Sequence, residues 1–235
     1  MMNETACRIG CAGWNLPKYL RDPSLSYLER YAQLFNCVEI NSSFYRHHRP
    51  KTYARWADAV PEDFRFSVKA PKAITHSAEV VKVTIDRFLN EIRELGDKLG
   101  PLLIQFPPKA AFNKSVASEL FLSFREKYNG EIVCEPRHAT WFELEAYELL
   151  KSFSISLVVA DPKPVPGAPE VLEQESSYYR LHGAPRIYYS EYTEEFLRQF
   201  KRNEALKRGG AWVIFDNTAL GYAYQNALSL MGSLP

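Results

Sequence analysis

Short apolar runs that end at a polar or charged residue recur along this chain at intervals of 23 to 37 residues. The runs begin near residues 8, 37, 64, 101, 131, 155, 178 and 211. They are almost continuously apolar, which is typical of parallel strands that are covered on both faces. The segments between them are long enough for a helix and its loops, so each repeat predicts one β/α unit.

Eight β/α units fit a closed (β/α)8 barrel of the TIM type best, with an open doubly wound α/β sheet as the alternative. A chain of 235 residues is long enough for one such domain spanning residues 1–235. A Rossmann fold is disfavoured because the first turn, Gly10 to Gly13, does not match the G-x-G-x-x-G pattern. Four prolines between residues 162 and 169 predict that the sixth crossover is an irregular loop and not an ordinary helix.

Helical periodicity and stop signals predict helices between the strands. A Ser26 to Glu29 capping box is expected to open the first helix. A second helix, marked by Phe88, Ile92, Leu95 and Leu99, is expected to end at Gly100-Pro101. Further helix candidates are the segments 51–59, 114–127, 144–152, 192–207 and 219–231.

The composition predicts a cytoplasmic protein without membrane contact. The net charge of +1 provides no global field toward nucleic acid or membrane. The four cysteines form no C-x-x-C pair, which favours reduced, buried thiols. No apolar run approaches the ~20 residues that a membrane-spanning helix needs.

Short motifs follow one another across almost the entire chain. They are Gly10 to Trp14, Val38 to Arg46, Phe64 to Ala70, Ile74 to His76, Gln105 to Pro108, Glu135 to His138 with Trp141, Tyr179 to Gly183, and Phe215 to Thr218. These motifs resemble those of the YecE-like family, a microbial domain of unknown function, and the resemblance implies a TIM-type β/α barrel and no settled reaction.

This chain differs from the family pattern at Lys18 to Pro23, in the first loop, and at Pro136, where the family usually has Phe. Because Pro136 lacks an N–H, we expect a bulge or strand end there.

Polar residues at the strand ends would form one ring, because all strands of a barrel point toward the same mouth. Burying so many ionisable groups costs several kcal/mol each unless they pair or bind something. Two interpretations stay open, a ligand site and an internal salt-bridge network that closes the barrel. The candidate residues are Trp14, Glu39, Asn41, Tyr45, Arg46, Lys69, His76, Gln105, Glu135, Arg137, His138, Asp161, Arg180, His182, Asp216 and Asn217.

Three of these residues are candidates for proton transfer. Glu135 and Asp161, on neighbouring strand ends, are expected to act as an acid and base pair, with His182 as proton shuttle. In the alternative, Arg137 neutralises Glu135, and Asp161 caps the proline-rich loop. Glu39 lies inside a strand, where it either serves the ligand or pairs with Arg180 or Lys69.

The remaining candidates suit binding. Lys69, Arg137 and Arg180 would hold negative charge on a ligand, while Asn41, Gln105 and Asn217 would orient it. Trp14 is a candidate for stacking on a flat ligand, although packing of the loop bases would place it similarly. Tyr45 and Arg46 would form a stacking and anion-binding wall, or simply anchor their loop. His76 and His138 sit on loops and are weaker candidates than His182.

The pattern favours an enzyme that uses acid–base chemistry on a small polar or anionic ligand. One alternative is a nucleic-acid-binding or phosphodiester-processing protein, because residues 46–82 contain eight basic and four acidic residues. Another is a sensor that binds a small ligand without turnover. A divalent metal is a further possibility, since Glu39, Glu135, Asp161, His182 and Asp216 are suitable ligand types. The cationic side chains in the same ring argue against a metal, and no other cofactor is indicated.

Overall fold

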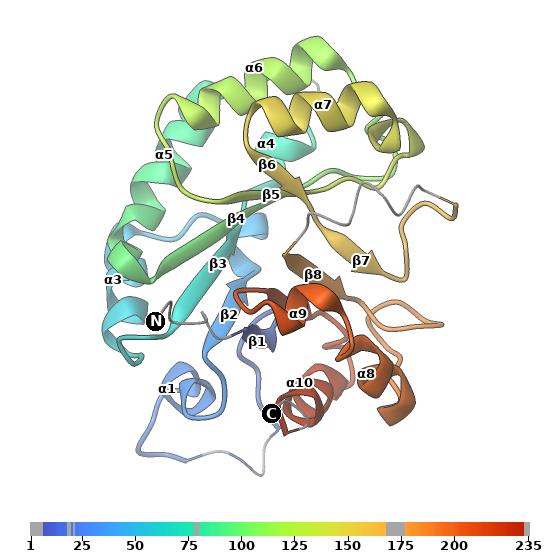
Figure 1. Ribbon diagram of the computed structural model, residues 1–235. Coiled ribbons are helices and arrows are strands. Elements are labelled where there is room, and N and C mark those ends of the chain that lie inside the picture. Colours follow the sequence, from blue (N-terminus) through green and yellow to red (C-terminus); the bar gives the residue numbers. More distant parts are fainter. Residues whose placement is uncertain (1–6, 18–19, 21, 78–79, 168–176, 233–235) are drawn as a thin grey trace.

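Strands and helices alternate along the chain in the computed structural model shown in Figure 1. The structure describes residues 7–17, 20, 22–77, 80–167 and 177–232. The strands lie at the centre and the helices lie outside them (Figure 1). This is the α/β arrangement that the repeated apolar runs predict.

The strands form two parallel sheets. The first has the order β2-β3-β4-β5-β6, with bounds Cys37–Ile40, Arg65–Lys69, Leu99–Gln105, Ile132–Glu135 and Ile155–Leu157. The second has the order β1-β9-β8-β7, with bounds Arg8–Cys11, Trp212–Phe215, Tyr178–Leu181 and Val159–Asp161. Each expected strand start lies within two residues of the observed one, and the expected sixth strand is divided into β6 and β7.

The edge strands of the two sheets are neighbours in two places. Only Val158 separates β6 from β7, and its N–H donates to the Cys134 carbonyl of β5 at 2.8 Å. At the other edges, Ala12 forms a parallel bridge with Glu39. Between β1 and β2 the Tyr31 hydroxyl accepts from the Cys11 N–H at 2.7 Å and donates to the Cys37 carbonyl at 3.0 Å. A tyrosine thus takes the place of a direct backbone hydrogen bond there.

Glycine at position 10 is required at this junction. A Cβ atom on Gly10 would lie 2.2 Å from the Cys37 carbonyl oxygen and 2.8 Å from the Tyr31 hydroxyl. Any side chain would therefore push β1 away from β2.

The helices follow the predicted segments, with two corrections. The helix expected to run through Leu99 ends at Ile92, a 3-10 helix follows from Arg93 to Lys98 with Gly96 at a left-handed φ of 55°, and Leu99 already belongs to strand β4. The segment 192–207 holds two helices and not one, because Asn203 begins a new helix by accepting from the Ala205 N–H. The helices are α1 Tyr27–Ala32, α2 Ser42–Tyr45, α3 Pro50–Asp58, α4 Lys72–Thr75, α5 Lys82–Ile92, η2 Arg93–Lys98, α6 Lys114–Arg125, η3 Ala139–Phe142, α7 Leu144–Ser152, α8 Glu194–Phe200, α9 Glu204–Lys207 and α10 Tyr222–Gly232. Among the described residues, no helix is long and apolar enough to cross a membrane.

Two local predictions are confirmed. The Ser26 hydroxyl accepts from the Glu29 N–H, and the Glu29 carboxylate accepts from the Ser26 N–H at 2.7 Å, which completes the capping box. Strand β5 ends at Glu135, directly before Pro136. In the sixth crossover, residues 162–167 form bends and turns, as the prolines require. Residues 168–176 of that loop, and residues 18, 19 and 21 of the first loop, lie outside the described residues.

The core consists of two clusters of buried side chains. The larger contains residues from both sheets and from the helices. The smaller joins the two sheets, since its members come from strands of both and from the residue between β6 and β7. They are Cys37, Leu103, Val133, Val158, Tyr178, Trp212 and Ile214. The facing sides of the two sheets therefore pack against each other.

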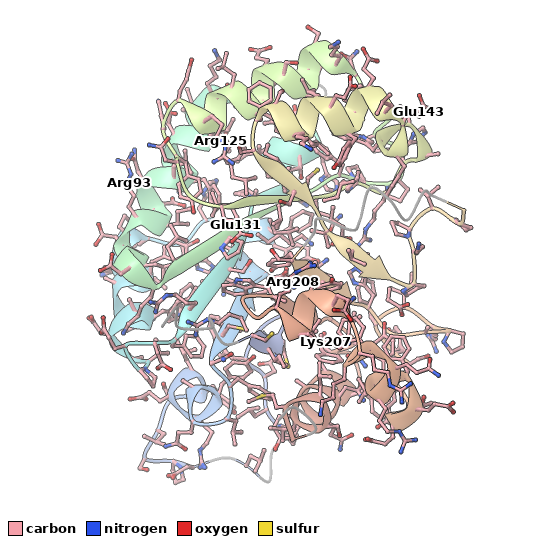
Figure 2. The ribbon with its side chains drawn as sticks, viewed as in Figure 1. Arg93, Arg125, Glu131, Glu143, Lys207 and Arg208 are labelled. Atoms are coloured by element: carbon pink, nitrogen blue, oxygen red, sulfur yellow. The ribbon has the colours of Figure 1, made fainter. Side chains whose placement is uncertain are left out.

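Arg125, at the carboxyl end of α6, ties down the chain before β5 and before β6 (Figure 2). Its guanidinium donates to the carbonyls of Phe153 at 2.8 Å, Gly130 at 2.7 Å and Ser154 at 2.9 Å. Glu131 is labelled in the same view, directly before β5. Arg125 thus fixes the chain at the amino ends of β5 and β6. The candidate polar residues lie at the opposite, carboxyl ends of the strands.

Candidate functional site

The candidate polar residues gather at the carboxyl ends of the strands. Side chains alternate along a strand, so residues two apart share one face. The residue two before each of five candidates belongs to the smaller core cluster. These pairs are Cys37 and Glu39, Leu103 and Gln105, Val133 and Glu135, Tyr178 and Arg180, and Ile214 and Asp216. The polar groups therefore form the next layer above the apolar one.

Arg180 is the centre of this layer and has no exposed surface. Its Nε donates to Glu39 Oε2 at 2.9 Å, and its Nη2 donates to Glu39 Oε1 at 2.7 Å. Nη1 donates to Glu135, and Nη2 also donates to Asp216 at 3.0 Å. One guanidinium thus joins three carboxylates from three strands. It is enclosed by them, so it can act on a ligand only through its partners.

Glu39 belongs to the buried base of this network. The Tyr178 hydroxyl lies 2.9 Å from its Oε2 and 2.7 Å from the Ser67 hydroxyl. Both Glu39 oxygens therefore have partners and no exposed surface remains. Pairing with Arg180, one of the two interpretations of Glu39, is the one that the geometry supports.

Glu135 is held by three cationic side chains. In addition to Arg180, the Arg137 Nε donates to Glu135 Oε1 at 2.8 Å. Burial raises the pKa of Glu135, but the charges of Arg180, His182 and Arg137 outweigh burial and hold the pKa well below its usual range. Glu135 therefore stays ionised and is a poor proton donor.

His182 links Asp216 and Glu135. Its Nδ1 lies 3.0 Å from Asp216 Oδ2. Its Nε2 lies 3.3 Å from Glu135 Oε1, without the alignment of a hydrogen bond, and has no hydrogen-bond partner among the described residues. Burial lowers the pKa of His182, but Glu135 and Asp216 outweigh it and raise the pKa above 6.5.

Lys69, the last residue of β3, differs from the other cations of the site. Its side chain is buried, and among the described residues it forms no ion pair. Its Nζ lies 4.2 Å from the centre of the Phe44 ring. Burial, reinforced by the charge of Arg180, lowers the pKa of Lys69 to about 8.

Asp161 lies at the end of β7, apart from the Arg180 network. The Tyr192 hydroxyl donates to Asp161 Oδ1 at 2.7 Å. The Gly183 N–H donates to the same hydroxyl at 2.9 Å. No hydrogen bond or ion pair joins Asp161 to Glu135 in the described part of the chain, and Asp161 is partly exposed.

Tyr188 is a site residue that the sequence analysis missed. It has a left-handed backbone with a φ of 71°, which is uncommon for a bulky residue. Its hydroxyl lies 3.4 Å from Arg137 Nη1, and its ring meets the His182 ring edge to face at 5.8 Å. The sequence offered one weak signal for Tyr188, its place in the loop after β8. That signal is weak because exposed loop tyrosines have many roles outside functional sites.

Several candidates hold loops around the site. The His138 ring nitrogen accepts from the Thr140 N–H and caps η3. Asn217 is buried and donates to Ser190 and Asn226, which fixes the loop after β9. Trp14 packs edge to face on Trp56 at 5.0 Å. These contacts favour the packing interpretation for the three residues.

The other candidates line the rim. Gln105 is buried at the end of β4. Asn41 stands at the N-cap position of α2 without a side-chain capping hydrogen bond, and its buried Oδ1 has no hydrogen-bond partner among the described residues. His76 is exposed, and its ring meets Phe44 at 5.3 Å. Tyr45 and Arg46 are exposed to solvent, with Tyr45 at 73%. Tyr45 and Arg46 therefore lie outside the buried network.

The carboxylates of the network do not suit a divalent cation. Both oxygens of Glu39 accept from Arg180, and both oxygens of Glu135 accept from arginines. A cation there would replace these contacts and meet the positive charge of Arg180. In the described part of the chain, no group of three or more His, Cys, Asp or Glu side chains is arranged to hold a metal.

A family model described as "Protein of unknown function DUF72" matches residues 8–235. The chain belongs to this family. The UPF0759 protein YecE of Escherichia coli K12 is 31% identical over 169 residues, which cover 68% of this chain and 61% of YecE. The match thus spans about three fifths of the length of that relative. The resemblance to the YecE-like family is confirmed.

Two further DUF72 relatives match nearly the whole chain. The UPF0759 protein YunF of Bacillus subtilis strain 168 is 25% identical, with 95% of this chain and 93% of YunF covered. The crystal structure of a DUF72 family protein from Thermotoga maritima MSB8 is 26% identical. It has a TM-score of 0.80 and covers 97% of this chain and 98% of that one. None of these descriptions names a reaction.

Proposed function

We propose that this DUF72 protein is an enzyme that performs acid–base chemistry on a small anionic ligand at the carboxyl ends of its strands. The observation that carries the proposal is the Nε2 of His182, which lies 3.3 Å from Glu135 Oε1 but forms no hydrogen bond among the described residues. Asp216 orients the ring through Nδ1, and the buried site leaves Nε2 as the nitrogen that can exchange a proton.

We infer a (β/α)8 barrel as the frame of this site. The short break at Val158 makes β6 and β7 two parts of one strand, and the contact of Ala12 with Glu39 places β1 beside β2. These neighbours support a closed ring of eight strands. In such a ring the network around Arg180 would lie across the mouth.

Each residue has a definite role in this proposal. Lys69 and Arg137 attract the anionic group, because both are cationic and neither is enclosed as Arg180 is. Glu135 is a positioning residue, since its low pKa prevents it from donating a proton. Asp161, partly exposed and held by Tyr192, is the second acid–base group. Arg180 lowers the pKa of Glu135 and of Asp216 and holds Glu39 in place.

The first experiment is a thermal-shift screen of phosphate, sugar phosphates and small carboxylates, each with and without EDTA or a divalent metal. A ligand at about 100 times its Kd stabilises the folded state by about 2.7 kcal/mol. We expect an anionic ligand to raise the Tm and Arg137→Met to weaken that effect. The proposal fails if no anion raises the Tm of the wild type.

Product analysis by mass spectrometry then separates an enzyme from a sensor. His182→Asn should retain binding but lose turnover. His47→Asn is the matched control, because His47 pairs with Glu91 and has no contact with the network. A ligand that binds and is recovered unchanged from the wild type would favour the sensor.

A second candidate function rests on a different surface. Exposed Tyr45 is followed by four exposed basic residues, Arg46, Arg49, Lys51 and Arg55. This surface would suit the phosphates and bases of a nucleic acid. A binding titration of an oligonucleotide tests it, because several phosphate contacts give a steep dependence of affinity on salt. Binding that does not change with salt would exclude this function.

A further inference from the structure

Lys69 is a buried amine without an acidic partner, in a site where the other buried cation is fully paired. Its side chain is 8% exposed. Glu39, Glu135 and Asp216 raise its pKa only through longer-range attraction, and burial together with Arg180 outweighs them. A lysine that only neutralised these carboxylates would be expected to contact one of them. Lys69 instead places Nζ over the Phe44 ring.

The backbone and loop around Lys69 hold it in this position. The Ser43 hydroxyl donates to the Lys69 carbonyl at 2.7 Å, which ties α2 to the end of β3. Phe44 follows Ser43 and supplies the ring beneath the amine. The amine is therefore presented by a strand end and by a loop that is fixed to it, as a reactive group requires.

Lys69 and Arg137 lie at the same carboxyl edge of the first sheet, because Lys69 ends β3, Arg137 follows the end of β5 by two residues, and only β4 separates these strands. Burial is the main cause that lowers the pKa of His76, and the positive charges of Lys69, Lys109, Lys72 and Arg137 lower it further. The charges of Lys69 and Arg137 therefore act on the same residue. A ligand between them would meet an amine on one side and a guanidinium on the other.

We propose that Lys69 forms an imine with a small carbonyl compound that carries a carboxylate or phosphate group. This inference rests on the proposed function, whose anionic ligand it assigns to a chemical class. Arg137 would hold the anionic group, and the carbonyl carbon would face Nζ of Lys69.

The step is balanced without a further reactant. The neutral amine attacks the carbonyl carbon, a C–N bond forms, the C=O double bond opens, and one proton moves from nitrogen to oxygen to give a carbinolamine. A second proton on the hydroxyl lets it leave as water while the nitrogen lone pair forms the C=N bond, and the nitrogen then releases its remaining proton, so that amine and carbonyl give imine and water. His182 and Asp161 are the acid–base groups available to carry these protons. No oxidation or reduction takes place.

The charge state of Lys69 supports this chemistry. With a pKa of about 8, a substantial fraction of the amine is neutral near neutral pH. The neutral fraction at pH 7 is roughly 300-fold larger than that of an ordinary lysine, as follows from the difference between the two pKa values. Only the neutral amine is a nucleophile.

The test is reductive trapping of the full chain near pH 7. Pyruvate and dihydroxyacetone phosphate are the probes, each with sodium cyanoborohydride, and acetone is the neutral control. Peptide mapping by mass spectrometry then locates the modified lysine. We expect the anionic probes to label Lys69 roughly tenfold or more above Lys109, because Lys109 is exposed and lacks the burial that favours a neutral amine. Whichever anionic probe labels better identifies the carboxylate or the phosphate as the favoured group.

Two variants complete the test. Lys69→Arg keeps the charge and should abolish the site-specific label, whereas Lys109→Arg should not change it. The proposal is overturned if Lys69 is labelled no more than Lys109, or if acetone labels it as well as the anionic probes do. Because the labelled site is mapped in the wild type, the result does not depend on the folding of a variant. Anions that raise the Tm without trapping at Lys69 would refute the imine and leave the proposed function standing.

Discussion

The substitution Lys69→Met is expected to stabilise the protein. Methionine fills a similar volume and keeps the contact with Phe44, but it brings no charge into the buried site. The wild-type chain holds a lysine whose folded-state pKa is lowered from 10.5 to about 8. This lowering corresponds to about 3 kcal/mol of destabilisation at neutral pH, at about 1.4 kcal/mol for each pH unit.

The effect should depend on pH in a definite direction. Between the two pKa values the unfolded chain binds more protons at Lys69 than the folded one does, so the stability of the wild type rises with pH there. Methionine does not titrate. The advantage of Lys69→Met should therefore shrink from about 3 kcal/mol near pH 7 to about 1 kcal/mol near pH 10.

Urea unfolding across this pH range measures the effect, with Lys109→Met as the exposed control. Packing differences between lysine and methionine shift the free energy of unfolding equally at every pH, so the change with pH isolates the charge. A difference between Lys69→Met and the wild type that stays constant from about pH 7 to about pH 10 would refute the reasoning.

Two further predictions concern the free energy of unfolding of other parts of the fold. Glu39→Gln replaces the carboxylate that accepts two hydrogen bonds from Arg180 but leaves Glu135 and Asp216 beside the guanidinium, so it should cost about 1.5–3 kcal/mol by urea unfolding. A loss below about 1 kcal/mol would show that Arg180 does not depend on Glu39. Ser26→Ala removes the acceptor of the capping box at α1 and should cost about 1 kcal/mol. For the capping box, Ser24→Ala is the control outside α1, and equal losses in both variants would contradict the assignment.

The strand ends were predictable because a buried parallel strand leaves a local signal. Each apolar run stops where the chain leaves the sheet, and β5 stops at Glu135 because Pro136 cannot donate the next hydrogen bond. The single helix predicted over residues 192–207 was wrong, since this segment holds the two helices α8 and α9. Its apolar period continues through Asn203, whose capping contact depends on side-chain geometry.

The partners inside the site were less predictable, because they lie far apart in the sequence. Arg180 joins Glu39, Glu135 and Asp216, and the sequence indicated only that these residues end up at one mouth. The alternation of side chains along β8 is the strongest local signal for the layered site. It places Tyr178, Arg180 and His182 on one face, with the apolar layer below and the polar layer above. Nothing local indicated that Tyr192 would hold Asp161.

The enclosed guanidinium of Arg180 also bears on how such a site can change during evolution. Its three carboxylate partners come from strand β2, from strand β5 and from the residue after β9, so altering any one of them leaves a buried N–H group of Arg180 without its acceptor. These three positions can therefore change only together, and related proteins are expected to keep or replace them as a set. New specificities would have to arise at neighbouring positions that do not bind Arg180, such as Lys69 and Tyr188.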